Sequence, residues 1–309
     1  MSKFHQLKIS VLLELFILYL KVEKKYSPHT CISYKNDLMQ FSAFCMRAYE
    51  TELLSDIRHT IIRSWIVNLM SENISSSSVN RKISALRSFY KWQLKKGYND
   101  KNPMIKITAP KKSKKLPVIL QDINITKLLE KEIAPDAEMG RYCEGRNHFI
   151  VEILYSTGIR RAELVALNLT DINMSRNELR VIGKGNKERS IPMTETLRIA
   201  INEYLVLRSE TKIIDPQALL LTNKGERIYP RLVHSIIALK LSGITTLSQK
   251  SPHVLRHSFA THMLDRGAEL HAIKEILGHA NLAATQVYTH NSISKLKETY
   301  SKAHPRSMK

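Results

Sequence analysis

Apolar side chains recur at three- and four-residue steps through most of the first hundred positions, which is the spacing of one face of an α-helix. The first such run comprises Leu12, Leu13, Phe16, Ile17 and Leu20. Ser27 with Pro28 is typical of the cap and first position of a second helix, and a third helix is predicted over residues 57–70. The second helix is expected to bury Ile32, Leu38, Phe41 and Phe44. The serine cluster 75–78 predicts the start of a fourth helix, which Gly97 ends.

The fourth predicted helix carries a row of basic side chains in addition to its apolar face. These residues are Arg81, Lys82, Arg87, Lys91 and Lys95. An ordinary solvated face and a DNA-facing surface explain such a row equally well, so both interpretations stay open.

The composition changes abruptly at residues 102–116, which read NPMIKITAPKKSKKL. Two prolines and five lysines with few large apolar side chains predict an extended linker rather than a helix. We therefore predict a helical domain over residues 1–105, a basic linker over 106–118 and a second domain over 119–309.

The second domain is predicted to combine helices with a small amount of strand. The runs ELRVIG and RSIPM have β-type composition and flank the glycine-rich segment GKGNKE, which indicates an antiparallel hairpin or short meander. Helical patterns occupy the rest, over residues 124–131, 148–155, 161–167, 196–209, 232–239, 252–266, 270–277 and 295–303. The predicted fold class is mainly α with a small antiparallel β-sheet, in two domains.

Composition narrows the class of partner. The 309 residues carry 48 Lys and Arg against 28 Asp and Glu, a formal charge of +20, which favours nucleic acid or an anionic surface. A basic protein with no polyanionic partner is the alternative that charge alone leaves open. Cys31, Cys45 and Cys143 form no CxxC pair and are expected to be reduced thiols. The apolar run at residues 11–20 is too short to cross a bilayer, so a cytoplasmic protein without a membrane partner is predicted.

Two arginines and a histidine are placed to hold an anion. Arg160 follows Gly158, where a new helix is expected to begin, and Glu163 three residues later can orient its guanidinium. His253 and Arg256 are spaced i, i+3 after a proline, so both belong to one side of the first turn of a helix.

A zinc site and a core position are the other interpretations of this histidine cluster. His253 and His257 have the i, i+4 spacing of metal ligands, but the segment lacks the HExxH glutamate and a third ligand. A position facing the core is the expectation for His257.

Three further residues carry functional chemistry only in combination with these. Lys184 lies between two glycines in the predicted hairpin turn, His279 follows a glycine at a helix end, and Tyr288 lies in TQVYTH. Each alone fits an ordinary role: a solvated lysine, a capping residue and a buried tyrosine. Together with the two arginines they form a set that can attack a phosphodiester without a metal or other cofactor, with the phenol as nucleophile.

The order Arg160, Lys184, His253, Arg256, His279, Tyr288 resembles that of the tyrosine recombinase (phage integrase) family, and within it the bacterial Xer recombinases (XerC/XerD-like) most closely. The segments STGIRRAEL, RVIGKGNKERSIP, PHVLRHSFATHML and ILGHANLAATQVYTH carry the resemblance. The helical first domain is similar to the core-binding (SAM-like) domain of the family, and the two domains are expected to form a C-shaped clamp. Residues 134–146 are longer and more polar than a compact Xer protein needs.

The resemblance implies a mechanism. Tyr288 attacks the scissile phosphate to give a 3′-phosphotyrosyl intermediate, His253 assists as base, Lys184 protonates the leaving 5′-oxygen, and Arg160, Arg256 and His279 stabilise the phosphorane. It further implies a homotetramer, or a heterotetramer with a paralogous recombinase, on two DNA duplexes, and a DNA translocase as a possible activator. The segment with Leu296 and Tyr300 resembles a helix that docks on a neighbouring protomer; packing within its own chain is the alternative.

The expected function is DNA recombination that resolves chromosome dimers at cell division. The alternative is an integrase or transposase of a mobile element, which shares every one of these residues. A type IB topoisomerase and a DNA-binding protein that has lost cleavage are further alternatives.

Overall fold

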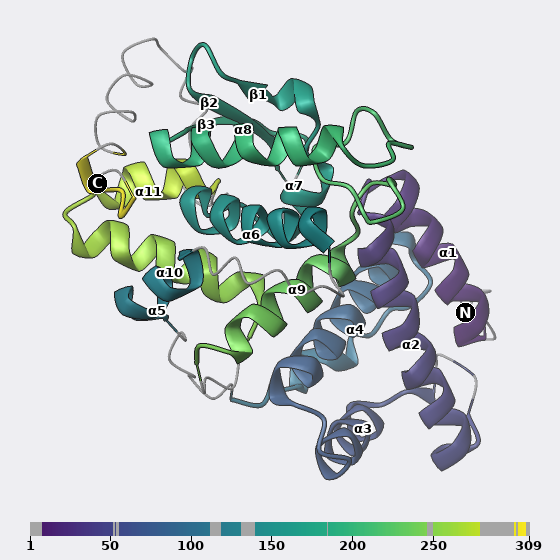
Figure 1. Cartoon of the computed structure of the whole chain (residues 1–309). Coiled ribbons are helices and arrows are strands. Elements are labelled where there is room, and N and C mark those ends of the chain that lie inside the picture. The colour runs from purple at the N-terminus through teal and green to yellow at the C-terminus, as the bar shows by residue number, and fades with distance from the viewer. Residues whose placement is uncertain are drawn as a thin grey trace. The chain divides into compact units, whose positions relative to one another are not determined.

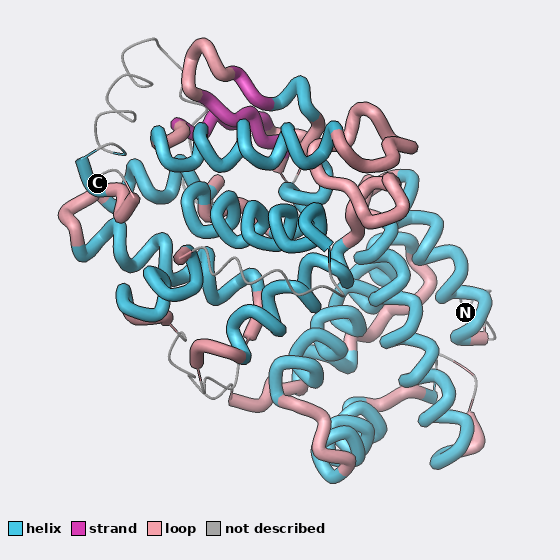
Figure 2. Tube along the Cα trace, viewed as in Figure 1, coloured by secondary structure: helices cyan, strands magenta, loops and turns pink. Residues whose placement is uncertain are grey.

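The computed structural model describes residues 8–111 apart from 52, 54 and 55, residues 119–130, residues 140–278 apart from 184 and 246–249, residue 300 and residues 302–306. The chain divides into two compact units, Met1–Lys115 and Leu116–Lys309. The predicted fold class is confirmed, because helix dominates both units and the described strands form one small sheet in the second (Figures 1 and 2). None of the described helices combines the length and apolar content that a bilayer crossing requires.

The described residues of the first unit form four α-helices and the short 3₁₀ turn η2. They are α1 (Ile9–Val22), α2 (Pro28–Tyr49), α3 (His59–Ser71), α4 (Ser76–Lys96) and η2 (Pro103–Lys106). The predicted caps are confirmed: the hydroxyls of Ser27 and Ser75 accept hydrogen bonds from backbone amides at the starts of α2 and α4. Gly97 adopts the left-handed conformation at the end of α4.

An aromatic cluster fills the core of this unit. Phe16 of α1 contacts Phe89 and Trp92 of α4, with ring centroids 5.3 and 5.4 Å apart. Phe41 of α2 packs edge-on against Trp65 of α3 at 5.0 Å. The predicted apolar face of α2 is wrong at one position, because Ile32 is exposed and the neighbouring Cys31 is buried in its place.

The basic row of α4 is only partly a solvated face. Lys82 is buried, and its ammonium lies 3.0 Å from a carboxylate oxygen of the buried Asp37 of α2. Arg81 also pairs with Asp37, and Arg87 donates a hydrogen bond to the carbonyl of Ile107 at 2.9 Å. Three of the five basic residues therefore make contacts within the unit, although only Lys82 is buried and the other four are exposed.

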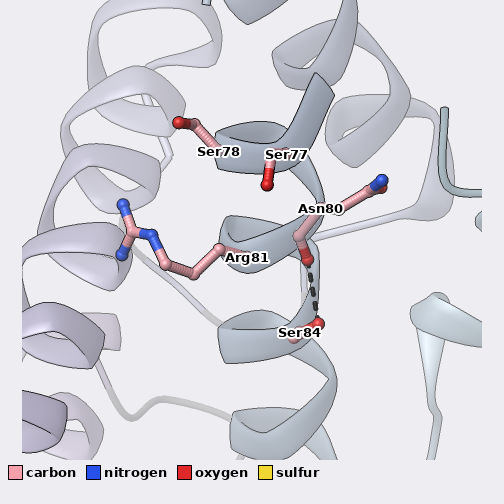
Figure 3. A pocket seen from close by; sticks show the side chains of 5 residues that line it. All are labelled: Ser77, Ser78, Asn80, Arg81 and Ser84. Atoms are coloured by element: carbon pink, nitrogen blue, oxygen red, sulfur yellow. Dashed lines mark hydrogen bonds between the residues drawn. The ribbon is translucent and has the colours of Figure 1, made fainter. Parts of the chain in front are cut away.

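The start of α4 also borders a shallow polar pocket (Figure 3). Its lining side chains are Ser77, Ser78, Asn80, Arg81 and Ser84. The Ser84 hydroxyl donates to the carbonyl of Asn80 at 2.9 Å, and the amide of Asn80 donates to the carbonyl of Pro110 at 2.9 Å. Two of the lining side chains thus make hydrogen bonds, one within α4 and one from α4 to the segment before the lysines at 111–115.

The second unit contains seven α-helices among its described residues. They are α5 (Asp122–Leu129), α6 (Gly140–Thr157), α7 (Arg161–Ala166), α8 (Glu195–Ser209), α9 (Pro230–Ser242), α10 (Pro252–Asp265) and α11 (Leu270–Leu277). Helix α6 lies between α8 and α10 (Figure 1) and is buried along its last nine residues. It is longer than predicted, because the polar residues Arg146 and Asn147 are also buried in it.

The strands of this unit form a three-stranded antiparallel sheet in the order β1-β2-β3. Its strands are β1 (Ile172–Asn173), β2 (Glu178–Ile182) and β3 (Glu188–Pro192). The predicted hairpin is confirmed as β2 and β3, with Val181 opposite Arg189 and Leu179 opposite Ile191. Because side chains alternate along a strand, Arg189 and Ile191 share the buried face.

The described end of the chain packs on α6 of its own unit. The Tyr300 hydroxyl donates to the carbonyl of Ser156 at 2.5 Å, and the His304 ring lies 2.8 Å from the same oxygen. Arg306 forms an ion pair with the buried Glu152 at 3.0 Å. Tyr300, His304 and Arg306 thus contact α6 of the same chain, whereas Leu296 lies outside the described residues.

Candidate active site

Arg160 occupies the start of α7 and is held on two sides. Its guanidinium donates to the Glu163 carboxylate at 2.8 Å and to the carbonyl of Gly278 at 3.2 Å. Glu163 also accepts the backbone amide of Arg160 at 2.8 Å, so the two residues close the first turn of the helix reciprocally. The Arg160 side chain remains 35% exposed, so part of it is accessible to a ligand.

Arg256 of α10 contacts the same end of α11 as Arg160 does. It is buried, and its guanidinium donates to the carbonyl of Gly158 at 2.6 Å and to that of Leu277 at 2.7 Å. Burial, and next the charge of Arg160, lower the pKa of Arg256 to about 10. The group therefore stays protonated at neutral pH, and two positive charges separated by 96 positions in the sequence meet near one helix end.

His253 lies one turn before Arg256, on the exposed side of α10. Although the residue as a whole is exposed, partial burial is the largest cause that lowers the pKa of its imidazole. The nearby His257 and Arg256 lower it further. A ring with a lowered pKa is neutral at pH 7, and a neutral imidazole can accept a proton.

The expectation for His257 is wrong. The residue is exposed, and the histidine of α10 that faces the core is His262, whose ring contacts the Tyr155 hydroxyl at 2.9 Å. Within the described part of the chain, no three His, Cys, Asp or Glu side chains lie close enough to hold a metal ion.

Lys184, His279 and Tyr288 lie outside the described residues. For Lys184 and His279 the preceding residue is described: Gly183 follows β2 and donates its amide to the carbonyl of Lys187, and Gly278 ends α11 in the left-handed conformation. Three of the six predicted residues, Arg160, His253 and Arg256, are thus brought into one neighbourhood, and the other three remain predictions.

The prediction missed a third arginine. Arg189 of β3 is buried, and its two terminal nitrogens donate to the two oxygens of Glu163 at 3.1 and 2.8 Å. Burial raises the pKa of the Glu163 carboxyl, but the hydrogen bonds from Arg189 and from the amide of Arg160 outweigh it and hold the pKa below its usual value. The one signal in the sequence is that Arg189 alternates with the core residue Ile191, and a charge on that face needs a partner.

Comparisons with known proteins point the same way. Residues 138–295 match the Phage integrase family, and residues 13–97 match the Phage integrase, N-terminal SAM-like domain. A protein of Pelobacter propionicus named tyrosine recombinase XerC is 41% identical over 293 residues, which cover 94% of each chain.

Two solved structures share the fold. One is the XerH site-specific recombinase in a post-cleavage complex with its palindromic difH substrate. It is 22% identical with a TM-score of 0.67, over 88% of this chain and 79% of that one. The other is a lambda integrase tetramer bound to a Holliday junction, 17% identical with a TM-score of 0.67, over 93% of this chain and 81% of that one.

Proposed function

The chain belongs to the phage integrase family, and we propose that it is a site-specific tyrosine recombinase that resolves chromosome dimers at cell division. It exchanges DNA strands through a tyrosine nucleophile. The likeness to a protein named XerC over nearly the whole chain favours the chromosomal role over integration of a mobile element.

We assign the six residues of the motif to one transesterification. The Tyr288 oxygen attacks the scissile phosphorus, and the bond from phosphorus to the 5′-oxygen breaks. His253 accepts the phenol proton, and Lys184 supplies a proton to the departing oxygen. Arg160, Arg256 and His279 stabilise the charge on the phosphorane. The phosphotyrosyl linkage replaces a phosphodiester, so the 5′-hydroxyl of a second strand can reverse the step without ATP.

One observation supports this assignment above the others: Arg160 and Arg256 converge on adjacent carbonyls at the end of α11. Guanidinium groups are suited to the non-bridging oxygens of a phosphate, which they contact through paired N–H groups. The lowered pKa of the neighbouring His253 suits a proton acceptor at neutral pH.

We propose the domain roles and partners on the same basis. Residues 1–105 form the core-binding domain, 106–118 the basic linker and 119–309 the catalytic domain, and the two domains close around duplex DNA. Four protomers act on two duplexes, either identical or paired with a paralogue, and a DNA translocase is a candidate activator. The protein acts in the cytoplasm, where its chromosomal substrate lies.

Covalent trapping tests the proposal. DNA fragments linked to the protein in its own cells are sequenced to find the site, and a nicked suicide duplex of that site is then offered to purified protein. Wild type is expected to accumulate a covalent complex and Tyr288→Phe none. If the wild type traps nothing on any captured site, the recombinase assignment fails. Relaxation of plasmids without the site by monomeric protein would favour a topoisomerase instead.

A further inference from the structure

Arg189 is a buried cation whose side-chain hydrogen bonds to described residues lie at the candidate active site. Its side chain is 6% exposed, and a guanidinium does not lose its proton in a protein, so the charge must be balanced internally. Glu163 supplies that balance through two parallel hydrogen bonds. The third nitrogen, Nε, donates to the carbonyl of Ile276 at 2.7 Å.

Three successive carbonyls at the end of α11 each accept a hydrogen bond from a different arginine. Ile276 accepts from Arg189, and the same holds for the pairs Leu277–Arg256 and Gly278–Arg160. The last carbonyls of a helix have no partner within it and carry partial negative charge. The arginines therefore hold the end of α11 at the point where the sequence continues to His279.

Glu163 connects two of these arginines. Its carboxylate accepts from Arg160 and Arg189 together, so Arg189 determines where Glu163 lies and Glu163 determines where Arg160 lies. Arg189 also belongs to β3, the strand that follows the turn with Lys184. One buried side chain thus links the hairpin, the start of α7 and the end of α11.

We propose that Arg189 is a positioning residue for strand cleavage. By holding Glu163 and the end of α11, it sets Arg160 and the segment that leads into His279 against the same phosphate. It makes no contact with DNA itself. The inference rests on the proposed recombinase function and adds to it a residue outside the six-residue motif.

The first test compares two arginines of the same sheet. Arg189→Met is expected to slow single-turnover cleavage of the suicide duplex by about 100-fold, because small displacements of catalytic groups cost that much. The affinity for DNA is expected to change less than about twofold, since the residue is buried away from the phosphate backbone. Arg180→Met removes an equal charge from the adjacent strand, where Arg180 is half exposed and pairs with Asp171, and is expected to cleave normally. Arg189→Lys is expected to recover little, because an ammonium cannot make the paired contact.

The second test asks whether Arg189 acts through Arg160. In an Arg160→Ala background, adding Arg189→Met is expected to slow cleavage by clearly less than the roughly 100-fold that it costs alone, because one of the two groups that it positions is already gone. Losses that multiply in the double variant would overturn the proposal. So would normal cleavage by Arg189→Met, or a loss that weaker DNA binding accounts for.

Folding is controlled with a variant that removes the charge pair together. If Arg189→Met does not fold, as judged by circular dichroism and thermal unfolding, the double variant Glu163→Gln with Arg189→Met removes the charges of both members of the buried pair. It is expected to show the same loss of cleavage with DNA binding retained, and normal cleavage by it would overturn the proposal. Failure of wild-type protein to cleave would count against the proposed function instead.

Discussion

Gly158 joins α6 to the Arg160 turn, and its substitution by alanine tests the packing of the site. Its φ is +61°, a conformation that costs an L-residue roughly 1–2 kcal/mol. A Cβ at this position would lie 2.5 Å from a ring carbon of Phe259 and 2.7 Å from a methyl of Leu277. This position therefore requires glycine for two reasons: the positive φ and the lack of space for a Cβ.

Gly267→Ala is the matched control, because it separates the two costs. Gly267 lies in the same unit with φ +84°, and a Cβ there would meet no atom within 4 Å. Gly267→Ala therefore carries only the cost of an alanine with positive φ. Gly158→Ala adds the overlap, for which overpacked cores typically lose about 1–3 kcal/mol. The two variants are expected to differ by about 2 kcal/mol in the free energy of unfolding, or roughly 4–8 °C in Tm for a unit of this size.

Scanning calorimetry and single-turnover cleavage measure the two consequences. The carbonyl of Gly158 accepts from Arg256 at 2.6 Å, so displacement of this turn is expected to slow cleavage by Gly158→Ala about 10-fold more than by the control. Equal Tm values for the two variants would refute the packing argument. Equal cleavage rates with different Tm values would refute the link between this turn and Arg256.

Three further predictions concern buried charge, pH and salt. Asp37→Asn leaves the buried Lys82 without its carboxylate, and urea unfolding is expected to show a loss of about 3–5 kcal/mol in stability. Glu14→Gln, which breaks the exposed pair with Lys35, is expected to cost under about 1 kcal/mol. Similar costs for the two variants would contradict the stabilising role of the buried pair. Burial lowers the pKa of His304 to about 4. As the pH falls, this histidine is therefore protonated in the unfolded chain before it is protonated in the folded protein. Up to about 3 kcal/mol of stability, complete above a pH of about 6.5, is then lost as the pH falls toward 4, and His304→Gln should abolish that slope. Replacing the five lysines of residues 102–116 by glutamine is expected to reduce the slope of log affinity for DNA against log salt by about 4, and an unchanged slope would exclude the linker from phosphate contact.

Local signals in the sequence were sufficient for most helix starts and for the hairpin. Ser27 and Ser75 cap their own helices, and Gly97 ends its helix, because each acts within one turn of the chain. The alternation in β2 and β3 likewise depends on neighbours only.

The environment of residues on crowded helices could not be predicted in the same way. Helix α10 is buried on most of its surface, so its apolar spacing does not show which histidine faces inward, and His262 rather than His257 does. The first turns of α6 were missed because their buried polar residue Arg146 bonds to Leu221 and Asn223, some 75 positions away.

The candidate site shows the same division. Arg160 and Arg256 were found because their motifs are local, and Glu163 because it lies one turn from Arg160. Arg189 was missed because its partners lie 26 positions before it and 87 after it, so the sequence of β3 alone does not predict them. Long-range ion pairs of this kind arise only when the fold brings the elements together.

The most direct test of the central claim is to identify the atom that becomes linked to DNA. The covalent complex on the suicide duplex is digested with protease and nuclease, and the nucleotide-bearing peptide is sequenced by mass spectrometry. The account predicts a 3′-phosphate on Tyr288, within the TQVYTH peptide, and a free 5′-hydroxyl on the released strand. A 5′-phosphate linkage, or attachment to any other residue, would contradict it.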